Sequence, residues 1–160
     1  MVPAVTDRRY KSAKPMKLLL LTVGKSALPY AKAGRDEYLE RLTCFAPVAK
    51  VTVKASNPAR EGAGLLELSE GCFRIVLHER GTALTSRALA AKVDEWRLSS
   101  RRVALIIGGA DGHDQPLLDA ADFLWSLGPL TLQHELALVV ALEQLYRAHT
   151  ILTGHPYHRD

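Results

Sequence analysis

The last six residues of the chain, "HPYHRD", gather side chains that can do chemistry. His155 and His158 are separated by a proline and a tyrosine, and Arg159 follows directly. Histidine is a common metal ligand, and two are present here. No third ligand has a spacing that would complete a site, so the pattern argues against a metal. Chain termini are usually poorly ordered. Chemistry placed at this terminus therefore needs something to hold it.

A second candidate site is the glycine-rich segment "IIGGADG" at 106–112. It follows an apolar run that is typical of a buried strand, and its glycines would let a ligand approach the backbone closely. Ligands bind beyond the carboxyl ends of strands in parallel sheets. The spacing matches neither a dinucleotide fingerprint nor a P-loop. The segment is either a ligand-binding loop or a tight strand-to-helix turn.

A third candidate is "WSLGPLTL" at 125–132, where a glycine–proline pair predicts a turn. Its backbone groups need partners, which a planar ligand such as adenine or the protein itself would supply. His134 lies just beyond, at the predicted start of the last helix. Glu143 and Arg147 are one helical turn apart, the spacing of an ion pair.

These segments depend on a predicted framework of alternating strands and helices. Strands are predicted at 16–24, 48–54, 73–77 and 102–109. Helices are predicted at 30–42, 85–98, 116–125 and 133–149, with a turn-rich loop at 55–64, a short segment at 65–69 and an extended loop or strand at 128–132. The alternation predicts an α/β fold with a largely parallel sheet in one domain.

The predicted last helix is apolar almost all the way round, which predicts burial on more than one side. Its apolar residues are Leu136, Val139, Val140, Leu142, Leu145 and Tyr146. The chain's own sheet can cover one face of this helix. A second subunit would cover another, so we expect a homodimer.

The composition limits the classes of protein to which the chain can belong. The chain has 160 residues, of which 48% are hydrophobic and 24% charged, so it can bury a core. No apolar run approaches the length of about 20 residues that a membrane helix needs. Cys44 and Cys72 match no metal or redox spacing, and we expect reduced, partly buried thiols in a cytosolic protein.

The positive charge is concentrated near the start of the chain. Residues 1–16 hold four basic side chains and one acidic one, a net of +3 out of a total of +4. The remaining body therefore gives no compositional evidence of RNA binding. Residues 1–15 lack periodicity and are interpreted as a flexible basic extension: an expression tag, a segment upstream of a natural start at Met16, or a functional arm.

Taken in order, several segments resemble the RlmH-type methyltransferases of the SPOUT superfamily. They are "MKLLLLTVGK", "EYLERL", "VLHERG", "IIGGADG", "WSLGPLTLQHELALVVALEQLYRA" and "GHPYHRD". The resemblance covers 16–160, read as one SPOUT methyltransferase domain. It implies a parallel sheet with a C-terminal trefoil knot, a homodimer, and use of S-adenosylmethionine. The implied reaction methylates the position-3 nitrogen of a pseudouridine in bacterial 23S ribosomal RNA, on the assembled ribosome.

The resemblance also implies site residues. The cofactor pocket would comprise Leu77, Gly108, Gly109, Leu127, Gly128, Pro129, Leu130, Thr131 and Leu132. The substrate side would comprise His134, Arg147, Tyr157, His158 and Arg159. In the family the tail of one subunit lies near the cofactor of the other, which would explain a terminus rich in chemistry.

Roles follow from the proton that the target nitrogen must lose. His158 or His134 would accept it. Arg147 and Arg159 would stabilise the developing anion or grip phosphate, and Tyr157 would stack on the nucleotide. Holding the methyl donor and the target nitrogen in line would supply much of the rate enhancement.

The chain departs from the family pattern at three places. Leu138 stands where an arginine is usual, "GGADG" replaces a loop such as "GGPEG", and His78 replaces an acid in "LHERG". The first departure weakens the expectation that all RNA contacts are kept. Two alternatives to the ribosomal RNA methyltransferase therefore stay open: an enzyme of this fold acting on another RNA such as transfer RNA, and a non-catalytic ribosome-associated binder.

Overall fold

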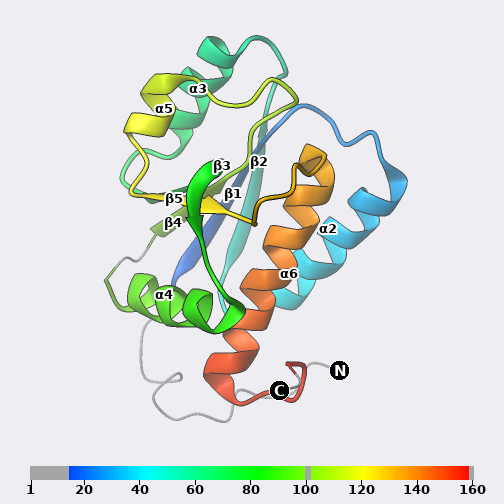
Figure 1. The fold of residues 1–160 in the computed structure, drawn as a ribbon, viewed down its shortest axis with the longest axis vertical. Coiled ribbons are helices and arrows are strands. Elements are labelled where there is room, and N and C mark those ends of the chain that lie inside the picture. The colour runs from blue at the N-terminus through cyan, green and yellow to red at the C-terminus, as the bar shows by residue number, and fades with distance from the viewer. Residues whose placement is uncertain (1–14, 100–101, 159–160) are drawn as a thin grey trace.

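The computed structural model describes residues 15–99 and 102–158, which form a five-stranded parallel sheet flanked by helices (Figure 1). The strands are β1 (Lys17–Val23), β2 (Val48–Val53), β3 (Phe73–Ala83), β4 (Arg102–Ile106) and β5 (Phe123–Ser126). The helices are α2 (Pro29–Leu42), α3 (Pro58–Leu68), α4 (Ser86–Ser99), α5 (Gln115–Asp119) and α6 (His134–Thr153). The predicted α/β fold with a parallel sheet is confirmed. The expected basic extension lies outside the described residues, apart from residue 15.

The strand order is β2-β1-β4-β3-β5, and every neighbouring pair is parallel. Alternate side chains of β1 enter two different cores, as the period of a strand dictates. Leu18 and Leu20 pack with α2, α4 and α6, whereas Leu21 and Val23 pack with α3 and α5. Helices therefore cover both faces of the sheet, as Figure 1 shows. The carboxyl ends of the central strands stay open.

The predicted loop at 55–64 is wrong, because residues 58–68 form helix α3. Asn57 caps this helix, its side chain accepting a hydrogen bond from the Arg60 N–H at 3.0 Å, and Pro58 fills the first turn. Gly62, one of the glycines that suggested a loop, serves close packing instead. A Cβ at Gly62 would lie 2.2 Å from the Asp114 carboxylate.

The helix predicted at 116–125 is wrong beyond Asp119, because residues 123–126 form the edge strand β5. Asp122 makes the change of direction. Its N–H donates to the Arg74 carbonyl at 3.0 Å, and its carboxylate accepts from the Arg74 N–H at 2.7 Å. This double contact places Phe123–Ser126 beside β3, which in turn runs six residues beyond its predicted end.

The apolar circumference of α6 is covered largely within the chain. Helices α2 and α4 pack on its two flanks, and Ala141, Leu142 and Leu145 are buried against them and the sheet. Gly34 allows the close approach of α2, since a Cβ there would lie 3.0 Å from a Val139 methyl group. Leu136 and Val140 stay half-buried. The described chain contains no helix with the length and apolar character that a membrane crossing needs.

The two cysteines are free thiols in different surroundings. Cys72 is buried in the core beside α3, as expected. Cys44 is exposed, so the expectation of partial burial is wrong for this residue.

The buried His149 on α6 is expected to make the stability of the fold sensitive to acid. Its ring is fully buried and stacks on Phe45 with centroids 5.1 Å apart. Burial, with a smaller effect of the Arg97 charge, lowers the pKa of His149 from 6.5 to about 4. The unfolded state therefore binds a proton at a higher pH than the folded state does. We expect the free energy of unfolding to fall as the pH drops from 6.5 to 4, by about 3 kcal/mol from this group.

The measurement is denaturant unfolding at several pH values in the wild type and in His149→Phe. The variant keeps the aromatic packing and cannot titrate, so its stability should fall less steeply over this window. Carboxylates titrate in both proteins and cancel in the difference. Parallel pH profiles would contradict the prediction.

Candidate active site

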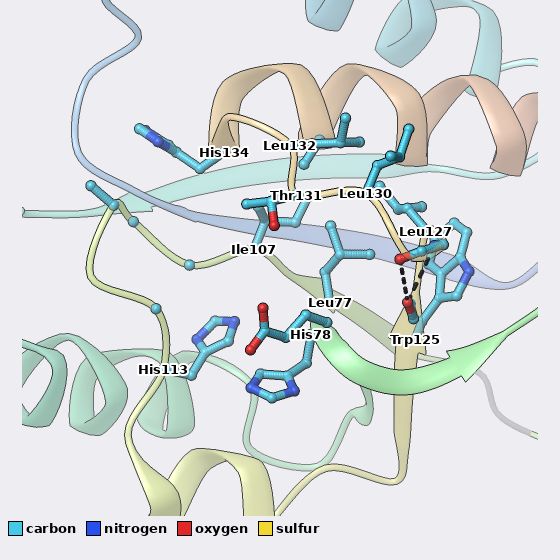
Figure 2. Close-up of a pocket in the computed structure, with 18 of the residues that line it drawn as sticks. Leu77, His78, Ile107, His113, Trp125, Leu127, Leu130, Thr131, Leu132 and His134 are labelled. Atoms are coloured by element: carbon cyan, nitrogen blue, oxygen red, sulfur yellow. Dashed lines mark hydrogen bonds between the residues drawn. The ribbon is translucent and has the colours of Figure 1, made fainter.

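A cleft of about 470 Å³ opens at the carboxyl ends of β3, β4 and β5, within the usual size range of small-ligand sites. Its lining comes from 77–79, 107–113, 125–128, 130–132, His134 and Ala137. Figure 2 shows the 130–132 loop and His134 on one side, with His78 and His113 on the other. Every residue predicted for the cofactor pocket lines this cleft except Pro129.

The glycine loop forms the floor of the cleft. Ile107 still bonds to β1, its N–H donating to the Leu21 carbonyl at 3.0 Å, and the chain then turns. Gly112 closes the turn with a φ of 76°, a left-handed conformation that favours glycine, and its N–H donates to the Gly109 carbonyl. A Cβ at Gly109 would lie 3.2 Å from Val23. The segment is both a tight turn and a cleft wall.

The loop after β5 is held by Ser126, which is buried. The Ser126 hydroxyl accepts from the Gly128 N–H and donates to the Gly128 carbonyl, both at 3.2 Å. Gly128 has a φ of 126°, which again favours glycine. These bonds hold the first residues of the loop at 127–132, a backbone arch beside the cleft, from which Leu130 projects with 79% of its surface exposed.

The third wall is an irregular part of β3. Its pairing with β5 shifts register between Leu77 and Thr82, and the displaced residues place His78 and Glu79 in the cleft. Gly81 makes the crossing with β5 sterically feasible. A Cβ there would lie 2.6 Å from the Leu124 carbonyl carbon and oxygen.

His113 is a cleft residue that sequence reasoning missed, although it follows the glycine loop directly. Its ring covers Gly108, where a Cβ would lie 2.9 Å from the imidazole. Burial and the nearby His78 lower the pKa of His113 below its ordinary value, so the ring is neutral near pH 7. Its Nε2 atom is buried and, among the described residues, has no hydrogen-bond partner.

His134 enters the cleft from the first turn of α6. Gln133 caps this helix, its side-chain oxygen accepting from the Glu135 and Leu136 N–H groups. Glu135, also missed in the sequence, is buried and accepts from the Ala27 and Leu28 N–H groups at 2.9 and 3.2 Å. This carboxylate locks the loop after β1 to the helix that carries His134.

Three of the other predicted substrate-side residues, Arg147, Tyr157 and His158, lie far from the cleft within one chain. Arg147 is thirteen residues after His134 on the same helix, about 20 Å along its axis, and Tyr157 packs beside Arg147. Figure 1 shows the red end of α6 far from its start. His158 adjoins Tyr157, and Arg159 lies outside the described residues. A single chain therefore separates two groups of candidate residues.

The bonds at this far end are made within the chain. Arg147 pairs with Glu143 at 2.7 Å, which confirms the ion pair expected from their spacing. Leu138, at the position where the family pattern has an arginine, is buried in the core. No group of three or more His, Cys, Asp or Glu side chains is arranged to hold a metal within 15–99 and 102–158.

Comparison with known proteins gives a consistent assignment. The family model described as "Predicted SPOUT methyltransferase" matches residues 16–158. A Thermus thermophilus protein named ribosomal RNA large subunit methyltransferase H is 46% identical over 144 residues, covering 90% of this chain and 99% of its own length. A protein of the same name from Acidovorax is 39% identical over 158 residues, covering 91% and 100%.

The solved structures agree on the fold. The tRNA (m1G37) methyltransferase of Aquifex aeolicus superposes with a TM-score of 0.57 at 16% identity, over 91% of this chain and 74% of that one. A probable methylase family protein from Haemophilus influenzae gives 0.55 at 12% identity, over 91% and 70%. The glycine-lined cleft, the parallel sheet and the sequence matches converge: the chain belongs to the SPOUT methyltransferase family, and it is a methyltransferase.

Proposed function

We propose that this enzyme methylates the position-3 nitrogen of a pseudouridine in bacterial 23S ribosomal RNA, on the assembled ribosome in the cytoplasm. The observation that carries the proposal is the 46% identity to a ribosomal RNA large subunit methyltransferase H over nearly the full length of both chains. The structural neighbours are less than 25% identical to this chain, so they support the fold and do not indicate which RNA is methylated.

The cleft fits S-adenosylmethionine as the methyl donor. A side chain at Gly108 would collide with His113, and one at Gly109 would crowd Val23, so the cleft presents backbone there. The arch at 127–132 would offer amides and carbonyls to an adenine edge. His113 Nε2 is a buried polar atom still lacking a partner in the described chain. When bound, the sulfonium supplies an activated methyl group.

The chain's own residues then have two tasks. The first is to hold the acceptor nitrogen in line with the donor, which the floor and arch of the cleft would favour. The second is to take the proton from that nitrogen, for which His134 and His158 are the candidates. His134 lines the cleft directly. His158 would have to come from elsewhere, because its own terminus lies at the far end of α6.

A homodimer would resolve this separation, with the C-terminal segment of one subunit completing the cleft of the other. The distance of about 20 Å between the two groups of residues supports this arrangement. The half-buried Leu136 and Val140 on α6 would contribute to the interface. We also propose the trefoil knot of the family, with the segment from β5 into α6 as the threaded part.

The decisive test is mass mapping of ribosomal RNA from a strain that lacks this protein and from the same strain after re-expression. Loss and recovery of one methylated pseudouridine in 23S RNA are expected. Loss of a methyl group from transfer RNA instead would mean that the protein is a methyltransferase whose substrate is transfer RNA. Calorimetric titration with S-adenosylmethionine adds a separate check, since a non-catalytic binder without a cofactor site would give no heat.

A further inference from the structure

The chain reverses direction after α6 and returns along the helix. Gly154 has a φ of 66°, and the His155 N–H donates to the Thr150 carbonyl at 2.9 Å, which closes the helix end. The Tyr157 N–H then donates to His155 Nδ1 at 3.1 Å. This compact turn brings Tyr157 back against α6.

The Tyr157 hydroxyl is held from two helices. It donates to Glu143 Oε1 on α6 at 3.0 Å, and it lies 3.1 Å from the Tyr38 hydroxyl on α2. Burial, with the bonds to Tyr38 and Glu143, raises the pKa of Tyr157 above its ordinary value, so the hydroxyl stays protonated. Since its proton goes to Glu143, its oxygen accepts from Tyr38.

The Tyr157 ring is engaged as well. It meets Tyr146 edge-on with centroids 4.7 Å apart. The guanidinium carbons of Arg147 and Arg41 lie 5.1 and 5.9 Å from its centroid. A ring contacted in this way serves the chain as an anchor, whereas the role suggested by the family resemblance was stacking on a nucleotide.

Glu143 is the centre of this arrangement. The same Oε1 atom accepts from Tyr157, from Arg147 Nη2 at 2.7 Å and from Arg147 Nε at 3.1 Å. A charged acceptor strengthens each of these bonds. One carboxylate therefore fixes both an arginine and the tyrosine that immediately precedes His158. His158 Nδ1 is buried and has no hydrogen-bond partner within the described residues.

We infer that Tyr38 and Glu143 are positioning residues that hold Tyr157 and thereby set the place of His158 on the acceptor side of the reaction. The inference rests on the proposed function, in which the C-terminal segment serves the RNA. Neither residue touches the cleft, so their effect must pass through Tyr157. Simple packing would instead predict lost stability with an unchanged turnover of the folded enzyme.

The kinetic test compares Glu143→Gln with Glu67→Gln, an exposed glutamate on α3 across the sheet, using ribosomes from a strain lacking the enzyme as substrate. We expect kcat to fall about tenfold or more in Glu143→Gln, since Gln keeps the size and loses the charge. Tyr38→Phe should lower kcat about threefold. The dissociation constant for S-adenosylmethionine should change less than twofold in all three. Adding Glu143→Gln to Tyr157→Phe should cost less than the product of the two single effects.

A spectroscopic test does not depend on turnover. With labelled histidine, the His158 ring signal is assigned by its disappearance in His158→Gln. We expect this signal to move toward that of an exposed histidine in Glu143→Gln and to stay in place in Glu67→Gln. An unchanged signal together with wild-type kcat in Glu143→Gln would overturn the inference. If the signal moves but the wild type methylates no ribosomal RNA, the proposed function fails and the anchoring of His158 stands.

Discussion

Removal of Tyr157–Asp160 is expected to reduce methyl transfer by at least a thousandfold while the affinity for S-adenosylmethionine stays within twofold of wild type. Such a loss matches removal of a group that acts in the chemical step. The cleft keeps its floor, arch and β3 wall in this variant, because all of them precede α6 or begin it. The terminus carries Tyr157 and His158, which lie at the other end of the helix.

The measurements are transfer of a labelled methyl group to ribosomes and calorimetric titration of the cofactor. Tyr157 also packs on the core, so thermal unfolding should accompany both assays and show that the variant is folded at the assay temperature. Turnover near the wild-type rate after truncation would remove the C-terminal segment from the mechanism. Lost cofactor binding in a folded variant would place it in the cofactor site instead.

A mixed dimer separates action within a subunit from action across the interface. The truncated chain keeps an intact cleft, and a full-length chain with a disabled cleft keeps its terminus. If the terminus serves the partner's cleft, coexpression restores activity in mixed dimers, to about a quarter of the wild-type sites for random pairing. If the terminus serves its own cleft, no mixture regains activity.

The sheet was predictable because its signals are local. The runs in β1 and β4 are almost uniformly apolar, as buried parallel strands are, and β2, an exposed edge strand, alternates. The errors arose where tertiary contacts decide. Gly62 and Gly64 weaken a helix by propensity, yet α3 forms because Asn57 and Pro58 start it, and close packing against Asp114 needs Gly62. β5 has apolar residues that fit either period, and the contact with Arg74 and the pairing with β3 favour the strand.

The candidate site was predictable in its backbone and less so in its side chains. Glycine and proline mark the loops at 108–112 and 127–132 in the sequence itself. His113 and Glu135 left no such signal, because a single histidine or glutamate acquires its role only from what folding places beside it. Tyr157 carries the clearest lesson of this kind. Its type predicts a platform for stacking on the nucleotide, and only the fold reveals its bonds to Tyr38 and Glu143, on which the inferred positioning of His158 rests.

Gly81→Ala is expected to weaken cofactor binding at least tenfold and to lower the free energy of unfolding by about 3 kcal/mol, at the upper end of overpacking costs. The added methyl group would lie 2.6 Å from the carbonyl carbon and oxygen of Leu124 and 2.8 Å from the carbonyl carbon of Trp125. All three are backbone atoms, so no side-chain rotation relieves the collision. The two strands must separate, and they carry opposite walls of the cleft.

The matched control is Gly64→Ala in α3. Its added methyl group would meet only the Val53 side chain, at an ordinary contact distance of 3.4 Å, while an alanine favours the helix by up to about 1 kcal/mol. Denaturant unfolding and cofactor titration should therefore distinguish the two variants. We expect Gly64→Ala to have a free energy of unfolding at or above that of the wild type and an unchanged affinity for the cofactor. Equal behaviour of the two alanines would mean that β3 can leave β5 without cost to the site. The irregular crossing at Gly81 would then play no part in forming the site. The geometry argues otherwise, because the shift in register at this crossing places Leu77, His78 and Glu79 in the same cleft as the arch after β5.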